Sequence, residues 1–121
     1  MKMRKIVVGD AVGYITEEEL AGERIRWNID GFTMENHIYK STVPCPTCIS
    51  RNGNCVICEA RVYGKDYCMA VVLSVVPDFK EVIMMTREAM IFKESDYERA
   101  VIMLNKMLDF FNNSPEVDIG D

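Results

Sequence analysis

The sequence contains no long hydrophobic segment. No apolar run approaches the roughly 18 residues that a membrane-spanning helix needs, and the opening MKMRKIVVGDAVGY lacks the apolar core and the small-residue cleavage site of a signal peptide. Internal repeats, low-complexity tracts and linker-like stretches are also absent. We therefore expect a cytoplasmic protein whose 121 residues form one domain around a single core.

The usual sequence signatures of catalysis are missing as well. The chain has no glycine-rich phosphate loop, and no His, Ser or Cys nucleophile constellation surrounds its single histidine. The carboxylates are spread along the chain in a way that is typical of solvated surfaces. We therefore predict that the protein is not an enzyme.

Cysteine, in contrast, is concentrated in one place. The segment CPTCISRNGNCVIC carries two Cys-x2-Cys pairs formed by Cys45, Cys48, Cys55 and Cys58. One such pair supplies two thiolates from a single turn, and two pairs complete the tetrahedron that Zn²⁺ prefers. In a reducing cytoplasm, clustered pairs are metal ligands or redox groups more often than disulfides. The spacing therefore predicts a structural zinc site in a loop spanning residues 37–58.

Other chemistries fit these cysteines less well. A redox Cys-x2-Cys pair usually begins a helix beside a βαβ pattern, iron–sulfur ferredoxins space their cysteines differently, and a disulfide framework needs an oxidising compartment. His37 precedes the first pair and can replace one cysteine in a Cys3His site, so both ligand sets stay open. Neither set leaves an open coordination position beside a general base, which favours a structural metal.

The residues before the cysteines carry strand and turn signals. Residues 3–15 are expected to form a strand interrupted near its glycines, and residues 17–22 a short helical turn that starts at the capping-box pair Thr16 and Glu19. Apolar and polar residues then alternate over residues 22–32, which predicts a half-buried strand that ends at an Asp-Gly turn.

The residues after the cysteines change period. Residues 59–76 predict one or two strands, and residues 81–86 another. Apolar residues at spacings of three and four then predict an amphipathic helix over residues 95–112, with Ser95 and Glu98 in capping-box positions. The domain is expected to end at residue 113, followed by a frayed, short acidic tail at residues 114–121.

The formal charge of −5 is unevenly distributed. Residues 1–65 carry a net charge of +1 and residues 66–121 a net charge of −6. Between Arg24 and Lys65 the local excess is three positive charges, so a polyanion is expected to bind there.

The order of these features resembles a known family. The run RIRWNIDGFTMENHIYKSTVPCPTCISRNGNCVICEARVYG, followed by YCMAVVLSVVPDFKEVIMM and a helix, is similar to the single-stranded DNA-binding proteins of tailed phages, whose OB-fold core carries a structural zinc. In that family a histidine precedes Cys-x9-Cys-x2-Cys, and Cys45, Cys55 and Cys58 match that spacing. Cys48 is an additional thiol, and His37 stands closer to Cys45 than in the best-known member.

The resemblance implies a β-rich α+β protein in which an OB-like small β-barrel carries the zinc loop and the C-terminal helix. It implies binding of single-stranded DNA during phage replication or recombination, in the host cytoplasm. OB folds use exposed aromatic rings and cations for this purpose. The candidate contacts are Arg24, Arg26, Tyr39, Lys40, Arg51, Arg61, Tyr63 and Lys65. Because zinc thiolates offset part of the local positive charge, we expect weak binding with a shallow salt dependence.

A second class of function fits the acidic half of the chain. A zinc-stabilised interaction or regulatory module would use its acidic helical half to dock a replication or transcription protein. The pI near 4.9 favours this function over nucleic-acid binding. The two functions are compatible in one protein.

Overall fold

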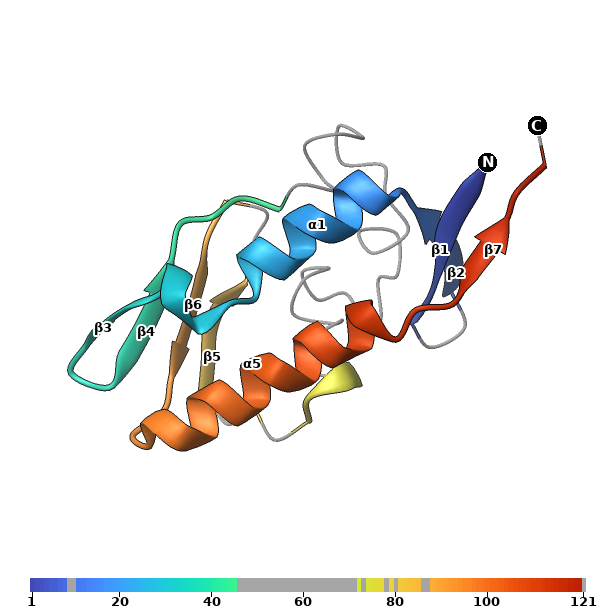
Figure 1. Cartoon of the computed structure of the whole chain (residues 1–121). Helices are drawn as coiled ribbons and strands as arrows, with labels where there is room; N and C mark the ends of the chain where they lie inside the picture. The colour runs from blue at the N-terminus through green and yellow to red at the C-terminus, as the bar shows by residue number, and fades with distance from the viewer. Residues whose placement is uncertain are drawn as a thin grey trace.

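The computed structural model describes residues 1–8, 11–45, 72, 74–77, 79, 81–85 and 88–120. In these residues the protein is a small α+β structure with two antiparallel sheets and two α-helices. The sheets lie at opposite ends of the helices, which run side by side between them (Figure 1). No closed barrel is formed within the described residues, so the predicted OB-like barrel is not confirmed.

The first sheet has three strands in the order β2-β1-β7. β1 (Lys2–Val8) and β2 (Ala11–Ile15) form a hairpin in which Val8 pairs with Ala11, so the chain reverses at the first predicted interruption. β7 (Glu116–Asp118) pairs antiparallel with the first half of β1. The expected frayed end was wrong in this respect, because these residues complete a sheet.

The second sheet has four antiparallel strands in the order β3-β4-β6-β5. They are β3 (Thr33–Glu35), β4 (Ile38–Ser41), β5 (Glu81–Met85) and β6 (Met90–Lys93). The β3–β4 hairpin turns at Asn36 and His37, whose φ angles of 52° and 65° are those of a type I′ turn. The Asp-Gly pair that was expected to form a turn lies instead in the short 3-10 helix η1 (Ile29–Gly31).

Helix α1 (Glu17–Arg26) begins at the predicted capping box, where the Thr16 hydroxyl accepts from the Glu19 backbone N–H and the Glu19 carboxylate accepts from the Thr16 N–H. The helix does not stop at Gly22, and the predicted strand over residues 22–32 was wrong. Ile25 is 65% exposed whereas Trp27 is 2% exposed, so the apolar alternation in the sequence does not follow one buried face.

Helix α5 (Tyr97–Asn112) confirms the C-terminal helix, with Asp96 rather than Ser95 as its N-cap. It is amphipathic, as the spacing predicted, and its buried residues are Ala100, Met103, Leu104, Met107 and Phe111. Within residues 59–76, where strands were expected, the described Val72, Ser74 and Val75 are helical. Residues 59–71 lie outside the described part of the chain.

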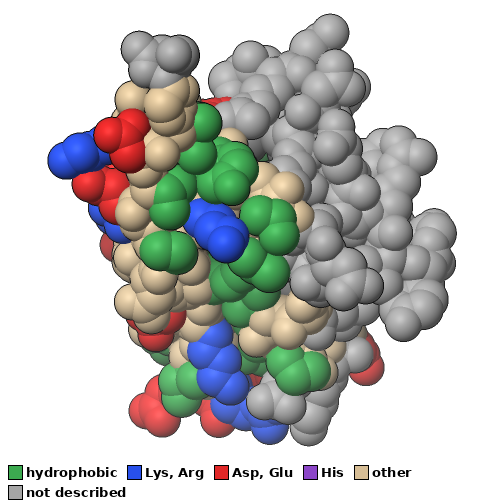
Figure 2. Space-filling model, turned by 90° about the vertical axis from the view of Figure 1, so that its right-hand side faces the viewer, with side chains coloured by type: hydrophobic (Ala, Val, Ile, Leu, Met, Phe, Trp, Pro, Cys, Tyr) green, Lys and Arg blue, Asp and Glu red, His purple; other side chains and the backbone are tan. Residues whose placement is uncertain are grey.

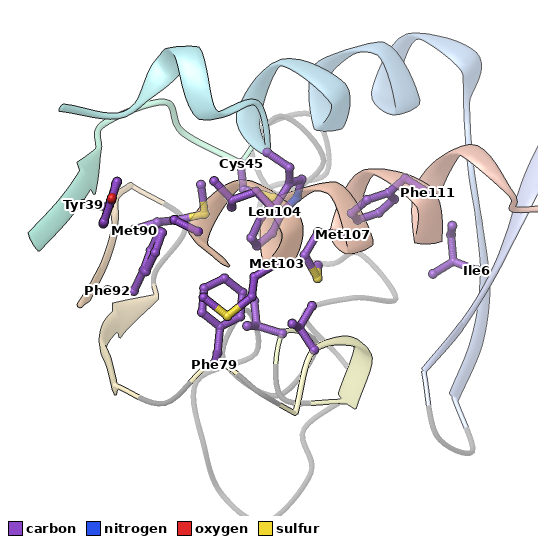
Figure 3. Close-up of a cluster of buried hydrophobic side chains, with 14 of the residues drawn as sticks. Ile6, Tyr39, Cys45, Phe79, Met90, Phe92, Met103, Leu104, Met107 and Phe111 are labelled. Carbon is purple, nitrogen blue, oxygen red and sulfur yellow. The ribbon is translucent and has the colours of Figure 1, made fainter. Parts of the chain in front are cut away.

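The core is one cluster that extends from sheet to sheet. Figure 3 shows Tyr39 and Phe92 of the four-stranded sheet at one end, and Ile6 and Phe111 at the other, with Leu104 and Met107 of α5 between them. Phe92 contacts three other rings, those of Phe32, Tyr39 and Phe79. Cys45, the first of the predicted zinc ligands, belongs to the same buried cluster.

Candidate metal centre and binding surfaces

Cys45 lies at the end of an irregular segment that leaves β4 after Ser41. Its side chain is 2% exposed and packs against α1. The thiol donates a hydrogen bond to Glu23 Oε1, with 3.4 Å between sulfur and oxygen. The first predicted ligand is therefore held in the protein interior with its sulfur directed at a carboxylate.

Glu23 joins this thiol to the single tryptophan. It is 1% exposed, and its second oxygen, Oε2, accepts from the Trp27 indole N–H at 2.8 Å. One buried carboxylate thus accepts hydrogen bonds from two donors on different segments. Glu23 was not predicted as a site residue, because the segment was read as a strand and only the helical spacing of four residues places its carboxylate beside the Trp27 indole.

Arg26 lies one helical turn beyond Glu23 and contacts the same segment. It is 1% exposed, its Nε donates to the Val43 carbonyl at 3.4 Å, and its guanidinium lies 5.6 Å from the centre of the Trp27 ring. The prediction that Arg26 contacts DNA was wrong, because a buried guanidinium cannot meet a solvated phosphate. Its structural role is to fasten residues 43–45 to α1.

Cys45 can serve as a zinc ligand only after it loses the proton that it donates to Glu23 here, because zinc binds the thiolate. That thiolate beside the Glu23 carboxylate would need positive charge to offset the repulsion between the two anions, which the buried Arg26 and Zn²⁺ would supply. Cys48, Cys55 and Cys58 lie outside the described residues, and the described residues alone contain no cluster of three or more metal-binding side chains.

His37, the alternative ligand, lies away from this corner. It occupies the exposed turn between β3 and β4, and its carbonyl accepts from the Glu94 backbone N–H at 3.0 Å. β4 separates it from the segment that leads to Cys45. The described residues therefore do not bring His37 and Cys45 together.

Tyr39 was predicted to stack on a base, and the structure corrects this. Its ring is 3% exposed and stacks on Phe92 at a centroid distance of 5.0 Å. Burial raises the pKa of the Tyr39 phenol, and the negative charges of Glu94 and Asp96 raise it further. Tyr39 is a core residue because its position on β4 directs its side chain to the face opposite Lys40.

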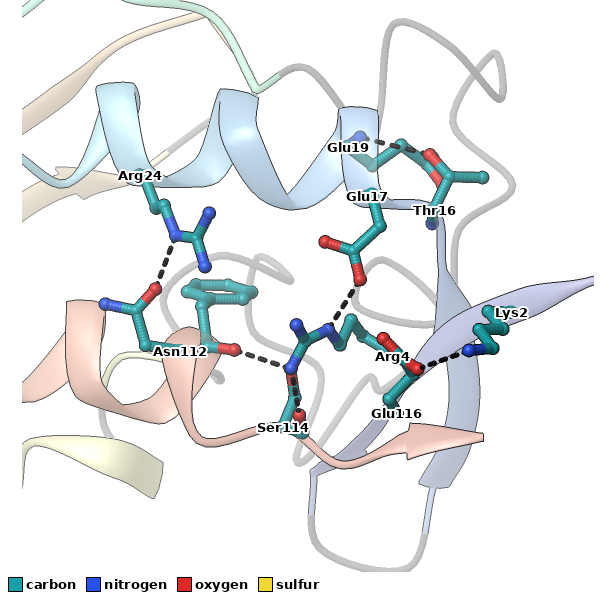
Figure 4. Close-up of polar contacts among 10 residues, drawn as sticks. Lys2, Arg4, Thr16, Glu17, Glu19, Arg24, Asn112, Ser114 and Glu116 are labelled. Atoms are coloured by element: carbon teal, nitrogen blue, oxygen red, sulfur yellow. Dashed lines mark hydrogen bonds and ion pairs between the residues drawn. The ribbon is translucent and has the colours of Figure 1, made fainter. Parts of the chain in front are cut away.

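Two predicted cations are exposed. Lys40 lies on the outer face of the four-stranded sheet, and Arg24 lies on α1, where its Nε donates to Asn112 Oδ1 of α5 (Figure 4). The remaining candidates, Arg51, Arg61, Tyr63 and Lys65, lie outside the described residues. The described part of the chain therefore contributes separate cations and no aromatic platform to the predicted interface.

A groove that sequence analysis did not foresee lies between β1 and the C-terminal end of α5. Its volume is about 430 Å³, and Lys5, Val7, Lys106 and Phe110 are among the residues that line it. The register of β1 places Lys5 and Val7 on one face of the sheet. Their approach to α5 could not be predicted from the sequence, because it depends on how β7 joins β1.

Comparisons with known proteins leave the fold and the site without a relative: no family model matches the chain, and neither a curated protein nor a solved structure is significantly similar to it. The similarity to phage single-stranded DNA-binding proteins thus stays a prediction from sequence. In the part of the chain that is described, neither helix combines the length and hydropathy needed to cross a bilayer.

Proposed function

We propose that this chain is a non-catalytic protein that binds single-stranded DNA and is stabilised by zinc at its cysteine cluster. The observation that carries the proposal is the fixed position of Cys45, which is buried against α1 and contacts Glu23. Once deprotonated, this sulfur would be a buried ligand whose position is set by α1. An OB-like arrangement, with the cysteine loop as part of the binding face, belongs to the same proposal.

The ligands of the proposed site are Cys45, Cys48, Cys55 and Cys58, because the position of His37 at the far end of β4 disfavours the Cys3His set. Bound Zn²⁺ would crosslink the loop, and its binding free energy would add to the folding free energy. The residues of α1 set where that crosslink attaches: Arg26 holds the backbone at Val43, and Glu23 contacts the sulfur of Cys45. The loop would thereby be tied to the helical core.

The proposed DNA surface combines cations with one tyrosine. Lys40 and Arg24, both exposed, belong to it within the described residues, and Arg51, Arg61, Tyr63 and Lys65 are assigned to it from the sequence. Arg26 and Tyr39 are buried and do not belong to this surface, so few phosphate contacts remain. We therefore expect weak binding whose affinity changes little with salt.

Fluorescence anisotropy of a labelled single-stranded oligonucleotide tests the proposal, using the zinc-loaded chain at low and moderate salt with duplex DNA as competitor. Saturable binding that duplex fails to displace is the expected result. Lys40→Glu should weaken binding and reduce the salt slope by about one, whereas Lys5→Glu, on the other sheet, is the matched control and should not. Absence of binding at low salt would rule the function out.

A second function, docking of a replication or transcription protein on the acidic helical half, is favoured by one observation. α5 leaves Tyr97 and Ile102 more than half exposed, at 56% and 54%, beside the exposed Glu98. Substitution of Ile102 by Lys should abolish partner binding without changing DNA affinity. If the substitution weakened DNA binding and left partner binding intact, the function would be assigned to nucleic acid alone.

A further inference from the structure

The groove between β1 and α5 lies where the chain leaves α5 and enters β7, and its volume is about 430 Å³. The described residues that line it include Lys5, Val7, Val75 and Phe110. None of these residues takes part in the proposed zinc or DNA site.

One wall of the groove is an open strand edge. β7 pairs only with Lys2, Met3 and Arg4 of β1, and the Lys5 N–H then donates to the Pro115 carbonyl at 2.9 Å before the chain turns away into α5. Residues two apart in a strand direct their N–H and C=O groups to the same side. The backbone of Val7 therefore faces the groove, and no described strand pairs with it there.

The described side chains around this edge are apolar, with Lys5 beside them. Val7 is 47% exposed, and Val75 and Phe110 form apolar parts of the lining. Lys5 brings a positive charge to the lining. No carboxylate within the described residues forms an ion pair with Lys5.

The molecule already shows which kind of strand this edge accepts. β7 and the residue after it read EVDI, in which acidic and apolar residues alternate. Its acidic groups pair with cations at the start of the chain: Glu116 lies 3.5 Å from the Lys2 ammonium, and Asp118 lies 3.1 Å from the Met1 amine (Figure 4 shows the first pair). Beyond Lys5, β1 continues with no described strand paired to it on this side.

Figure 2 shows the face on this side of the molecule, where hydrophobic side chains surround a Lys or Arg side chain. Strand register places Met3, Val7, Val12 and Val117 on one face of the three-stranded sheet together with Lys5. An apolar side chain of a bound segment, lying beside Val7, would extend this hydrophobic surface.

We propose that the groove binds an extended segment of a partner protein, with alternating acidic and apolar residues, which adds to β1 alongside Val7 in line with β7. Backbone hydrogen bonds to Val7 hold the segment, an apolar side chain contacts Phe110 and Val75, and an acidic side chain pairs with Lys5. This interaction is independent of the proposed DNA and zinc sites.

The test is a fluorescence anisotropy titration of the full zinc-loaded chain with a labelled peptide EVDIEV, an extension of the chain's own EVDI, and with KVKIKV as the reversed-charge probe. EVDIEV should bind at least tenfold more tightly than KVKIKV. Lys5→Glu should weaken EVDIEV binding at least tenfold, whereas the matched control Lys40→Glu, an exposed lysine on the other sheet, should leave it unchanged.

Two further variants test the backbone contact. Val7→Pro removes the N–H that faces the groove but no hydrogen bond to β2, so it should weaken peptide binding far more than Val7→Ala, which keeps the N–H. If V7P lowers the melting temperature, the backbone contact is tested with an N-methylated EVDIEV on the unaltered chain instead. This peptide should not bind, because it lacks the N–H groups that would pair with β1.

Equal binding of the two peptides, equal binding by V7P and V7A in folded proteins, or tight binding of the N-methylated peptide would overturn the proposal. Displacement of the peptide by a single-stranded oligonucleotide would also overturn it and assign the groove to nucleic acid. A dimer that must dissociate before the peptide binds, detected by light scattering, would assign the edge to a second copy of the chain.

Discussion

Glu23 is a buried carboxylate that accepts hydrogen bonds from the Trp27 indole and the Cys45 thiol. Glu23→Ala should lower the free energy of unfolding by about 2 kcal/mol, because it leaves the buried indole N–H without an acceptor. Glu23→Gln keeps one carbonyl oxygen and should lose less. Urea unfolding followed by circular dichroism measures both changes.

Glu18→Ala is the control for this prediction, since Glu18 is exposed on the same helix. It should change the free energy of unfolding by less than about 0.5 kcal/mol. A loss in E23A no larger than that in E18A would show that the buried carboxylate does not stabilise the fold.

Tyr39 provides a second prediction for a single residue, concerning pH. Its folded pKa is raised above the ordinary value of 10.0 by burial and nearby negative charge. Its contribution to stability is therefore complete below pH 10 and falls as the pH rises through the folded pKa, because the unfolded phenol loses its proton first. The difference in unfolding free energy between the native chain and Tyr39→Phe should shrink above pH 10, as measured by urea titrations at several pH values. A difference that stays constant up to strongly alkaline pH would contradict this.

Among the helices, the capping box of α1 gives the clearest expectation. Thr16→Ala removes the hydroxyl that accepts from the Glu19 N–H at 3.0 Å and should lower the free energy of unfolding by about 1 kcal/mol. Thr42→Ala, at an exposed position outside any element, should have no comparable effect. Thermal unfolding of the two variants side by side measures the difference, and equal melting temperatures would show that the cap is dispensable.

Element signals in the sequence were reliable where one period extended over many residues. Helix α5 was predicted because its apolar residues repeat at spacings of three and four over four turns, and only its cap moved from Ser95 to Asp96. For α1, the prediction was too short a helix followed by a strand, because Ile25, Trp27 and Ile29 alternate with polar residues. The exposed fractions show a helical pattern instead, in which Ile25 faces solvent and Arg26 faces the core.

The candidate site was only partly predictable for a related reason. The cysteine spacing indicated a metal, and ligand chemistry depends on local spacing that the sequence displays. The contacts of Glu23 and Arg26 with residues 43–45 depend on how α1 packs against the chain after β4, a tertiary relation that leaves no local pattern. Tyr39 and Lys40 are adjacent in sequence and point to opposite faces of β4, so only the strand register separates the core residue from the surface cation.

For the molecule as a whole, α1 and α5 connect two separate sheets, and the cysteine-bearing residues join the end of β4 to the rest of the second sheet. Cys45 is buried with Glu23 and Trp27 at this junction. Zinc at the cysteine cluster would therefore stabilise the whole domain through α1. The stability of the entire chain, and not of one loop, is expected to depend on the metal.

The most direct measurement is thermal unfolding of the zinc-loaded chain with and without a strong zinc chelator, under reducing conditions and followed by circular dichroism. The account predicts one zinc ion per chain and a melting temperature that falls by more than about 10 °C on chelation and recovers when zinc is returned. An unchanged melting temperature, in a protein shown to have lost its zinc, would contradict a structural role for the cysteine cluster.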